Sequence, residues 1–188
     1  MEEIENLNVG EGLDPPSTYR FRKWKKGAET VTYYSRKSPR IPNFDYTSDH
    51  YYFLTVCTHN RRCLFGEPAR LNGWGRIAEE QILRLETHYS NVKVDQYVVM
   101  PNHIHMILVL GCGEKAEKNP DLQQIMAQLK SGISREIRKT AADITVWQRS
   151  FHDHVIRTQK DYEKIWMYIQ TNPLRWDKDC FYIDPTMC

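Results

Sequence analysis

Residues 92–110 read VKVDQYVVMPNHIHMILVL, and this stretch decides the fold. Apolar and β-branched residues predominate in both of its halves, which is typical of strands. Between the halves stands Pro101-Asn102, a pair of residues that favours a turn. We therefore predict an antiparallel hairpin with strands at 92–100 and 103–110.

The segments on either side of this hairpin predict a regular alternation of strands and helices. Aromatic and β-branched runs indicate further strands, and apolar residues at helical spacing indicate helices. In chain order, the predicted elements are a strand at 51–57, a loop at 58–73, a helix at about 75–88, the hairpin, a loop at 111–118, a helix from the start signal Asn119-Pro120-Asp121 to about residue 139, a strand at 147–157, and a helix that follows the capping box Thr158–Asp161 and ends at Asn172.

This order, β-α-β-β-α-β-α, places the chain in the α+β class. It matches the ferredoxin-like β-α-β-β-α-β pattern, with an antiparallel sheet and one extra C-terminal helix. An antiparallel sheet that helices cover on one face leaves its other face available for a ligand or a partner.

The beginning of the chain differs in composition from the rest. Residues 1–16 hold five acids and no Lys or Arg, whereas residues 17–40 hold eight bases with aromatic residues between them. Bases neutralise phosphates and aromatic rings stack on unpaired nucleobases, although a solvated arm with local aromatic packing would look the same. We predict an arm at 1–44, a compact domain at 45–184 and a tail at 185–188. The bases of the arm are Arg20, Arg22, Lys23, Lys25, Lys26, Arg36, Lys37 and Arg40.

Composition narrows the class of protein. The chain has 188 residues, of which 40% are hydrophobic and 27% charged, as in a globular domain. No apolar run approaches the ~18 residues of a membrane helix, and the first residues lack the basic start and apolar stretch of a signal peptide. The five cysteines include no CxxC pair. We expect a cytoplasmic protein with reduced thiols and no membrane contact.

Two histidines in the hairpin could carry chemistry. Side chains alternate along a strand, so His103 and His105 share a face, and two imidazoles at this spacing can chelate a divalent metal ion. A third ligand must come from elsewhere, and a pair of surface or hydrogen-bonded histidines is the alternative interpretation. His152 and His154 repeat the spacing in the predicted fourth strand, where Asp153 points to the other face.

A second candidate group lies on the last helix. Tyr168 and Asn172 are four residues apart, so they lie on one helix face, one turn from each other. Tyr168 falls at the edge of the apolar stripe, where it could face either the core or a site. A half-buried tyrosine without a chemical role is the alternative.

Several of these segments together resemble a known family. Val99-Met-Pro-Asn-His-Ile-His-Met-Ile-Leu-Val109 resembles the HUH motif of single-tyrosine transposases, and Tyr168-Ile-Gln-Thr-Asn-Pro173 resembles the signature of their nucleophile helix. The resemblance extends over roughly residues 36–180 and is closest to the REP-associated tyrosine transposases. Further segments that resemble the family are 53–61, 64–67, 130–135, 147–151 and 153–157.

The resemblance implies an enzyme that cleaves and rejoins single-stranded DNA beside hairpins through a 5′-phosphotyrosine intermediate. His103 and His105 would be metal ligands, Tyr168 the nucleophile, and Asn172 the residue that completes the metal site, where relatives often have Gln. The ion would be Mg²⁺ or Mn²⁺. Relatives that form dimers imply a possible homodimer. We expect the bases of the arm and of the basic helix to bind the DNA; those of the helix are Lys130, Arg135 and Arg138.

Two other functions are compatible with parts of the sequence. A domesticated protein could bind hairpin nucleic acid and regulate it without cleavage, but a pure binder has no need of His103, His105 and Tyr168 together. A hydrolase of small phosphoesters would need a second metal centre or an acidic ligand cluster, and the sequence offers neither.

Overall fold

The computed structural model describes residues 19–26, 29–36, 40–41, 43–112 and 119–184, and the chain divides into two units, residues 1–44 and 45–188. In the first unit, strands β1 (Tyr19–Lys26) and β2 (Glu29–Arg36) form an antiparallel hairpin. The sequence pattern predicted an arm at 1–44 but did not predict these two strands.

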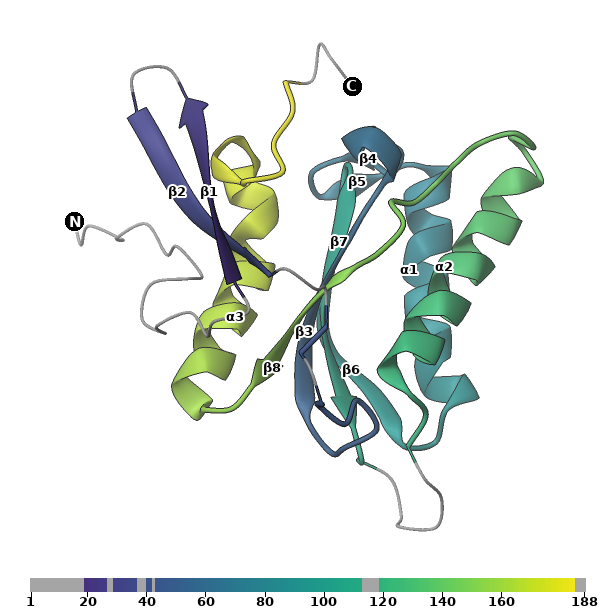
Figure 1. Ribbon diagram of the computed structural model, residues 1–188. Coiled ribbons are helices and arrows are strands. Elements are labelled where there is room, and N and C mark those ends of the chain that lie inside the picture. The colour runs from purple at the N-terminus through teal and green to yellow at the C-terminus, as the bar shows by residue number, and fades with distance from the viewer. Residues whose placement is uncertain (1–18, 27–28, 37–39, 42, 113–118, 185–188) are drawn as a thin grey trace. The chain divides into compact units, whose positions relative to one another are not determined.

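The second unit is built on a four-stranded antiparallel sheet with the strand order β6-β7-β3-β8 (Figure 1). The strands are β3 (Tyr51–Cys57), β6 (Val92–Met100), β7 (His103–Leu110) and β8 (His152–Ile156). The helices are α1 (Gly73–His88), α2 (Leu122–Arg138) and α3 (Gln159–Thr171). Short elements complete the unit: the 3-10 helices η1 (His59–Arg61) and η2 (Asn172–Lys178) and the strands β4 (Gly66–Glu67) and β5 (Arg70–Leu71).

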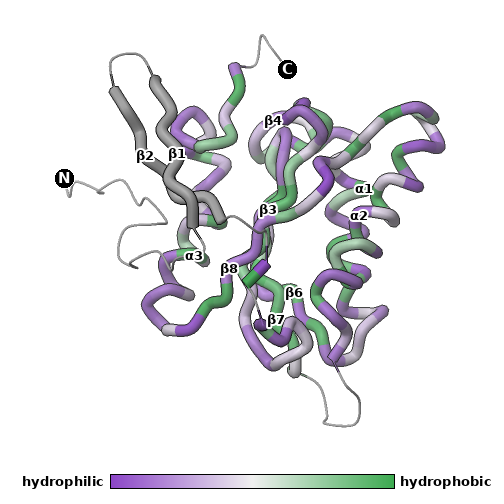
Figure 2. Tube along the Cα trace, viewed as in Figure 1, coloured by the Kyte–Doolittle hydropathy of each residue, from purple (hydrophilic) through white to green (hydrophobic). Residues whose placement is uncertain are grey.

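The sheet has helices on both faces. Helices α1 and α2 lie side by side on one face, and α3 lies on the other (Figure 1). Ile107 and Val109 of β7 pack with Ile165 and Ile169 of α3 in one apolar cluster, and hydrophobic residues follow the strands and the inner helix faces (Figure 2). The second face of the sheet is thus not left open, as the sequence had suggested, but is partly covered by the last helix.

Strand β7 lies in the centre of the core, and all eight of its residues are buried. The hairpin predicted for residues 92–110 is confirmed, with Val92 opposite Leu110 and Met100 opposite His103. The register shifts once, between Val94 and Gln96, which marks a β-bulge in β6.

The N-terminal cap is as predicted in helix α3 but differs in helix α2. Thr158 caps α3 as predicted, because its hydroxyl accepts from Asp161 N at 3.1 Å. Helix α2 is capped by Asp121, which accepts from Gln123 N at 2.7 Å, and not by Asn119. The Asn119 amide instead donates to the Thr47 carbonyl at 2.9 Å. Asn119, the first residue of the predicted start signal, therefore makes a long-range hydrogen bond and does not cap the helix.

Other predicted boundaries also change. Helix α1 begins at Gly73 because Asn72 caps it, and the predicted loop before it contains η1, β4 and β5. Helix α3 ends at Thr171, but the chain continues as the 3-10 helix η2 through Pro173.

The strand predicted at 147–157 is shorter than expected. Only β8, residues 152–156, joins the sheet, and Trp147 forms an isolated bridge with Thr58. The carbonyls of Gln148 and Ser150 accept from Lys130 Nζ at 2.6 and 3.2 Å. A side chain from α2 thus binds this segment in place of a neighbouring strand.

The cysteines differ in their covalent state. Cys57, Cys112 and Cys180 are free thiols, whereas Cys63 is disulfide-bonded, so the expectation of reduced thiols is wrong at Cys63. Among the helices in the described ranges, none combines the length and the apolar content that a membrane crossing requires.

Candidate metal centre and tyrosine site

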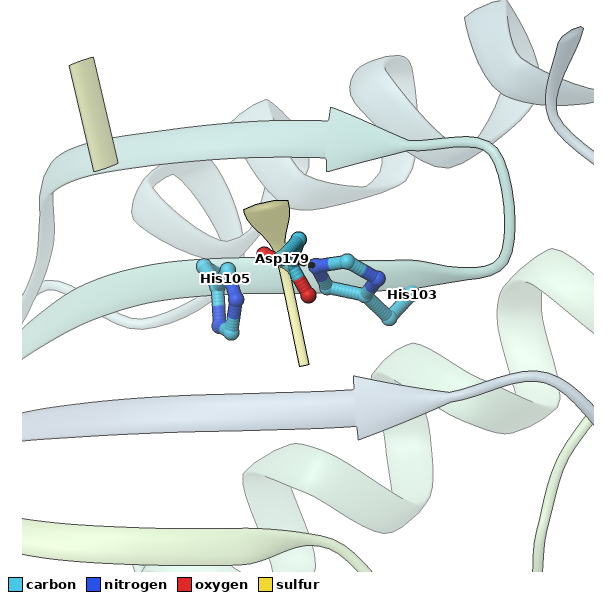
Figure 3. A group of neighbouring side chains, drawn as sticks. All are labelled: His103, His105 and Asp179. Carbon is cyan, nitrogen blue, oxygen red and sulfur yellow. Dashed lines mark ion pairs between the residues drawn. The ribbon is translucent and has the colours of Figure 1, made fainter. Parts of the chain in front are cut away.

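His103 and His105 lie next to each other on β7, on the sheet face that α3 covers. Both side chains are buried, and their ring centres are 4.4 Å apart. Asp179, just after η2, brings its buried carboxylate next to the two imidazoles (Figure 3). One ligand atom from each of these three residues lies within 4.8 Å of the other two.

Hydrogen bonds determine which nitrogen of His103 carries the proton. The Asn102 side chain donates from Nδ2 to the Phe181 carbonyl at 2.9 Å, so its oxygen faces His103 Nδ1 at 2.8 Å. Because an amide oxygen only accepts, Nδ1 of His103 must be the protonated nitrogen. The lone pair of Nε2 then points into the cluster, where this buried atom has no hydrogen-bond partner among the described residues.

Helix α3 and the first residue of η2 bring two further groups to the same place. The Tyr168 hydroxyl lies 3.2 Å from His105 Nε2 and 3.2 Å from Asp179 Oδ2. Asn172 donates from Nδ2 to Asp179 Oδ2 at 2.6 Å, and its buried Oδ1 has no hydrogen-bond partner in the described part of the chain. The four residues that the sequence singled out, His103, His105, Tyr168 and Asn172, are therefore brought together, and all of them belong to the second unit.

Burial sets the protonation states of the cluster. Burial, with a smaller contribution from the Arg61 charge, lowers the pKa of His103 to about 3. Burial also holds the pKa of His105 well below its usual range, and the neighbouring His103 adds to this effect. Both imidazoles are thus neutral, as metal ligands must be. Burial raises the pKa of Tyr168, and the adjacent Asp179 carboxylate raises it further, so the phenol keeps its proton in this arrangement.

The donor set fits a divalent cation. His103 Nε2 and Asn172 Oδ1 are buried atoms with unused lone pairs, and the Asp179 carboxylate supplies a negative charge beside them. Burying such atoms without a partner is costly, and a cation would satisfy both. A mixed set of imidazole nitrogen and carboxylate or amide oxygen suits Mn²⁺ and related transition ions, and is usable by Mg²⁺.

Sequence reasoning did not find Asp179. The residue lies beyond the Tyr-Ile-Gln-Thr-Asn-Pro motif and beyond a kink at Arg175, in a segment without helical or strand period. Its position depends on tertiary hydrogen bonds: Asn172 donates to one carboxylate oxygen, and Phe181 N donates to the other at 2.6 Å. The only local signal was an acid a few residues after the helix.

The second histidine pair does not repeat this arrangement. His152 is exposed, and His154 pairs with Asp161 of α3 at 2.8 Å. In the described residues, the one group of three or more potential ligands is His103, His105 and Asp179. Asp153 points to the other face as predicted, where it is buried and accepts from Tyr46 OH at 2.8 Å.

The predicted DNA-binding bases fall into two sets. Lys130, Arg135 and Arg138 line a surface cavity of about 390 Å³ on α2, together with two serines and Trp147. The Lys130 ammonium also donates to the carbonyls of Gln148 and Ser150. In the first unit, the structure describes the strand backbone but not the side chains of Arg20, Arg22, Lys23, Lys25, Lys26 and Arg36; Lys37 lies outside the described residues, and Arg40 is half-buried.

Comparison with known proteins identifies the family. The family model for IS200-like transposases matches residues 46–172. An uncharacterised protein of Haemophilus influenzae is 32% identical over 169 residues, which cover 79% of this chain and 94% of that protein. A second protein of that organism, provisionally named as a REP-associated tyrosine transposase, is 25% identical over 142 residues, which cover 70% of this chain and 74% of that protein.

A solved structure shares the fold. It is described as the REP-associated tyrosine transposase bound to a REP hairpin, and it matches with a TM-score of 0.54 and 23% identity over 72% of this chain and 73% of that one. The family model spans both histidines, Tyr168 and Asn172. The resemblance noted in the sequence is therefore confirmed, and the chain belongs to the family of IS200-like transposases.

Proposed function

We propose that this protein is a REP-associated tyrosine transposase that cleaves and rejoins single-stranded DNA beside hairpins, with Tyr168 as the nucleophile. One observation carries the proposal. The Tyr168 hydroxyl lies 3.2 Å from His105 Nε2, inside a buried cluster that also holds two unused acceptor atoms and a carboxylate. A phenol beside a set of metal-ligand atoms is the combination needed to transfer a phosphodiester to tyrosine.

The side chains have distinct tasks in this reaction. His103, His105, Asn172 and Asp179 would hold a divalent ion, which supplies a positive charge for the scissile phosphate and favours the phenolate form of Tyr168. The Tyr168 oxygen then attacks phosphorus, the bond from phosphorus to the 3′ oxygen breaks, and the chain keeps the 5′-phosphate on the tyrosine. The Tyr168 hydroxyl gives up one proton and the released 3′ oxygen takes up one, so the protons balance. Because the phosphate ester is conserved, a second 3′-OH can reverse the step without ATP.

The proposed substrate is hairpin DNA with a single-stranded flank. The solved relative is described as bound to a REP hairpin, and the α2 cavity of this chain offers three bases beside Trp147. Positive side chains bind the phosphates of the hairpin. The strand to be cleaved is proposed to be single, because a stacked duplex would keep its backbone away from the buried Tyr168. We therefore assign Lys130, Arg135 and Arg138 to the hairpin, together with the bases of the arm at 1–44.

The arrangement of elements is consistent with this assignment. The order of strands β6-β7-β3-β8, with α1 and α2 on one face, supports a ferredoxin-like domain over 45–184 that carries the tyrosine on its extra helix. A hairpin-binding regulator without cleavage activity is the alternative. It is disfavoured because a binder has no use for neutral buried imidazoles beside a tyrosine.

A covalent-capture assay tests the proposal. Labelled single-stranded DNA with REP-like hairpins is incubated with the protein and Mn²⁺ or Mg²⁺, then separated on a denaturing gel. We expect a metal-dependent covalent band that Tyr168→Phe abolishes. Tyr89→Phe, which removes the hydroxyl that bonds to Gln128, is the matched control and should keep the band. Tight native binding without any covalent band would favour the regulator instead.

A further inference from the structure

The turn η1 places an arginine beside the metal centre. The Arg61 guanidinium carbon lies 5.3 Å from the centre of the Phe181 ring. That ring in turn lies 4.7 Å from the His103 ring and 5.9 Å from the His105 ring. Arg61 is exposed and forms no ion pair among the described residues, so its donors are available to a ligand that reaches the cluster.

The backbone around Arg61 is rigidly held in an unusual conformation. Asn60 and Arg61 have φ of 53° and 55°, in the left-handed region that side chains with a Cβ rarely adopt. The buried Thr58 hydroxyl lies 2.7 Å from the Arg62 carbonyl, and His59 N donates to the Val146 carbonyl at 2.8 Å. Non-glycine residues persist in such conformations where the surrounding structure determines them, often at functional sites.

The charge of Arg61 is effective at the cluster despite its exposure. It lowers the pKa of His103, after burial, and it opposes the burial that raises the pKa of Cys57 to about 11 and of Cys180 to about 12. The cluster has no cationic side chain of its own, because both imidazoles are neutral and Asp179 is an acid. An approaching phosphodiester is negative, and attack on phosphorus adds further negative charge.

We propose that Arg61 binds a backbone phosphate of the single strand within one nucleotide of the cleavage point and so positions the strand for Tyr168. A guanidinium presents parallel N–H donors that match two phosphate oxygens, and the Arg61 guanidinium lies over the Phe181 ring. Arg61 is thus a positioning residue, and this inference rests on the function proposed above.

The test measures binding without cleavage. Anisotropy of a labelled hairpin with a single-stranded flank is recorded in EDTA, in the Tyr168→Phe background. Arg61→Met keeps an unbranched side chain but removes the charge, and we expect it to weaken binding about tenfold. Arg62→Met changes the neighbouring exposed arginine and should have a small effect. Arg61→Lys keeps the charge without the planar fork and should give intermediate affinity. Matching melting temperatures will show that the variants fold.

An uncharged phosphate identifies the contact. Methylphosphonates are introduced one at a time along the flank, and the cleavage point is mapped by capture with Tyr168 intact. A methylphosphonate within one nucleotide of the cleavage point should lower the affinity of the protein with Arg61 about tenfold. The same methylphosphonate should hardly change the affinity of Arg61→Met. An equal penalty in both proteins, or equal losses for Arg61→Met and Arg62→Met, would overturn the inference. Absence of capture would count against the proposed function, whereas the binding comparison would still report on Arg61.

Discussion

Burial of a neutral imidazole makes the stability of this protein depend on pH. Burial lowers the pKa of His103 from 6.5 to about 3, so between these values the unfolded chain binds a proton that the folded chain does not. Above pH 6.5, His103 therefore does not change the unfolding free energy with pH. As the pH falls from 6.5 toward 3, the unfolding free energy decreases by about 1.4 kcal/mol per pH unit.

Comparison of variants isolates this contribution. When the pH is lowered from 7 to 5, the unfolding free energy should decrease by about 2 kcal/mol less in His103→Asn than in the unmodified protein. Urea denaturation in EDTA measures both decreases. His88 is exposed, and His88→Gln should follow the unmodified protein. Parallel pH profiles for His103→Asn and the unmodified protein would show that His103 is not buried in its neutral form.

Asp179 is the negatively charged donor of the cluster, so its removal should weaken cation binding. We expect Asp179→Asn to lower Mn²⁺ affinity about tenfold or more, because an amide oxygen is a weaker ligand than a carboxylate. Electron paramagnetic resonance titration of free Mn²⁺ measures this without any DNA. Asp177 is exposed two residues earlier, and Asp177→Asn should bind Mn²⁺ normally. Equal affinity in the two variants would exclude Asp179 from the metal centre.

At the scale of elements, helix α3 is docked on the sheet by polar contacts as well as by its apolar face. Tyr162 OH donates to Asp95 Oδ2 at 2.7 Å, and Asp95 lies at the bulge of β6, where the register shifts. This hydrogen bond, with burial, raises the pKa of Tyr162 to about 12. His154 of β8 contacts Asp161 at the helix start in the same way.

Loss of the Tyr162 hydroxyl should therefore loosen the tyrosine helix. We expect Tyr162→Phe to lower the unfolding free energy by about 1–2 kcal/mol, since the Asp95 carboxylate loses a charge-assisted hydrogen bond. Urea denaturation measures the change. Tyr51 packs edge-on against Tyr162 and is 44% exposed, so Tyr51→Phe should cost much less. Similar costs for the two variants would mean that the Asp95 contact adds no stability.

Elements with a local pattern could be predicted, and contacts set by tertiary structure could not. Alternation along β7 correctly put His103 and His105 on one face, and helical spacing correctly put Tyr168 and Asn172 one turn apart. Asp179 has no such period, because Asn172 and Phe181 N position it across a kinked segment. The start of β8 was mispredicted for a similar reason, since the Lys130 ammonium binds the carbonyls of Gln148 and Ser150.

At the scale of the whole molecule, the candidate site is assembled within one structural unit of one chain. Strand β7 supplies the histidines, α3 supplies Tyr168, and η2 with the residues after it supplies Asn172 and Asp179. The tyrosine helix packs on the sheet of its own chain through Ile165 and Ile169. A homodimer would therefore not be needed to complete the site, although the earlier expectation of a possible dimer stays a prediction.

Complementation between two inactive variants distinguishes these arrangements. One variant carries Tyr168→Phe and keeps the proposed metal ligands, and the other carries His105→Asn and keeps the tyrosine. If each chain uses its own tyrosine, as the 3.2 Å separation between Tyr168 OH and His105 Nε2 indicates, the mixture should capture no more DNA than either variant alone. Mixing Tyr168→Phe with the unmodified protein controls for simple dilution and should reduce capture in proportion. Capture restored in the first mixture would require exchange of the tyrosine helix between chains, because only an exchanged helix brings an intact Tyr168 to intact histidines.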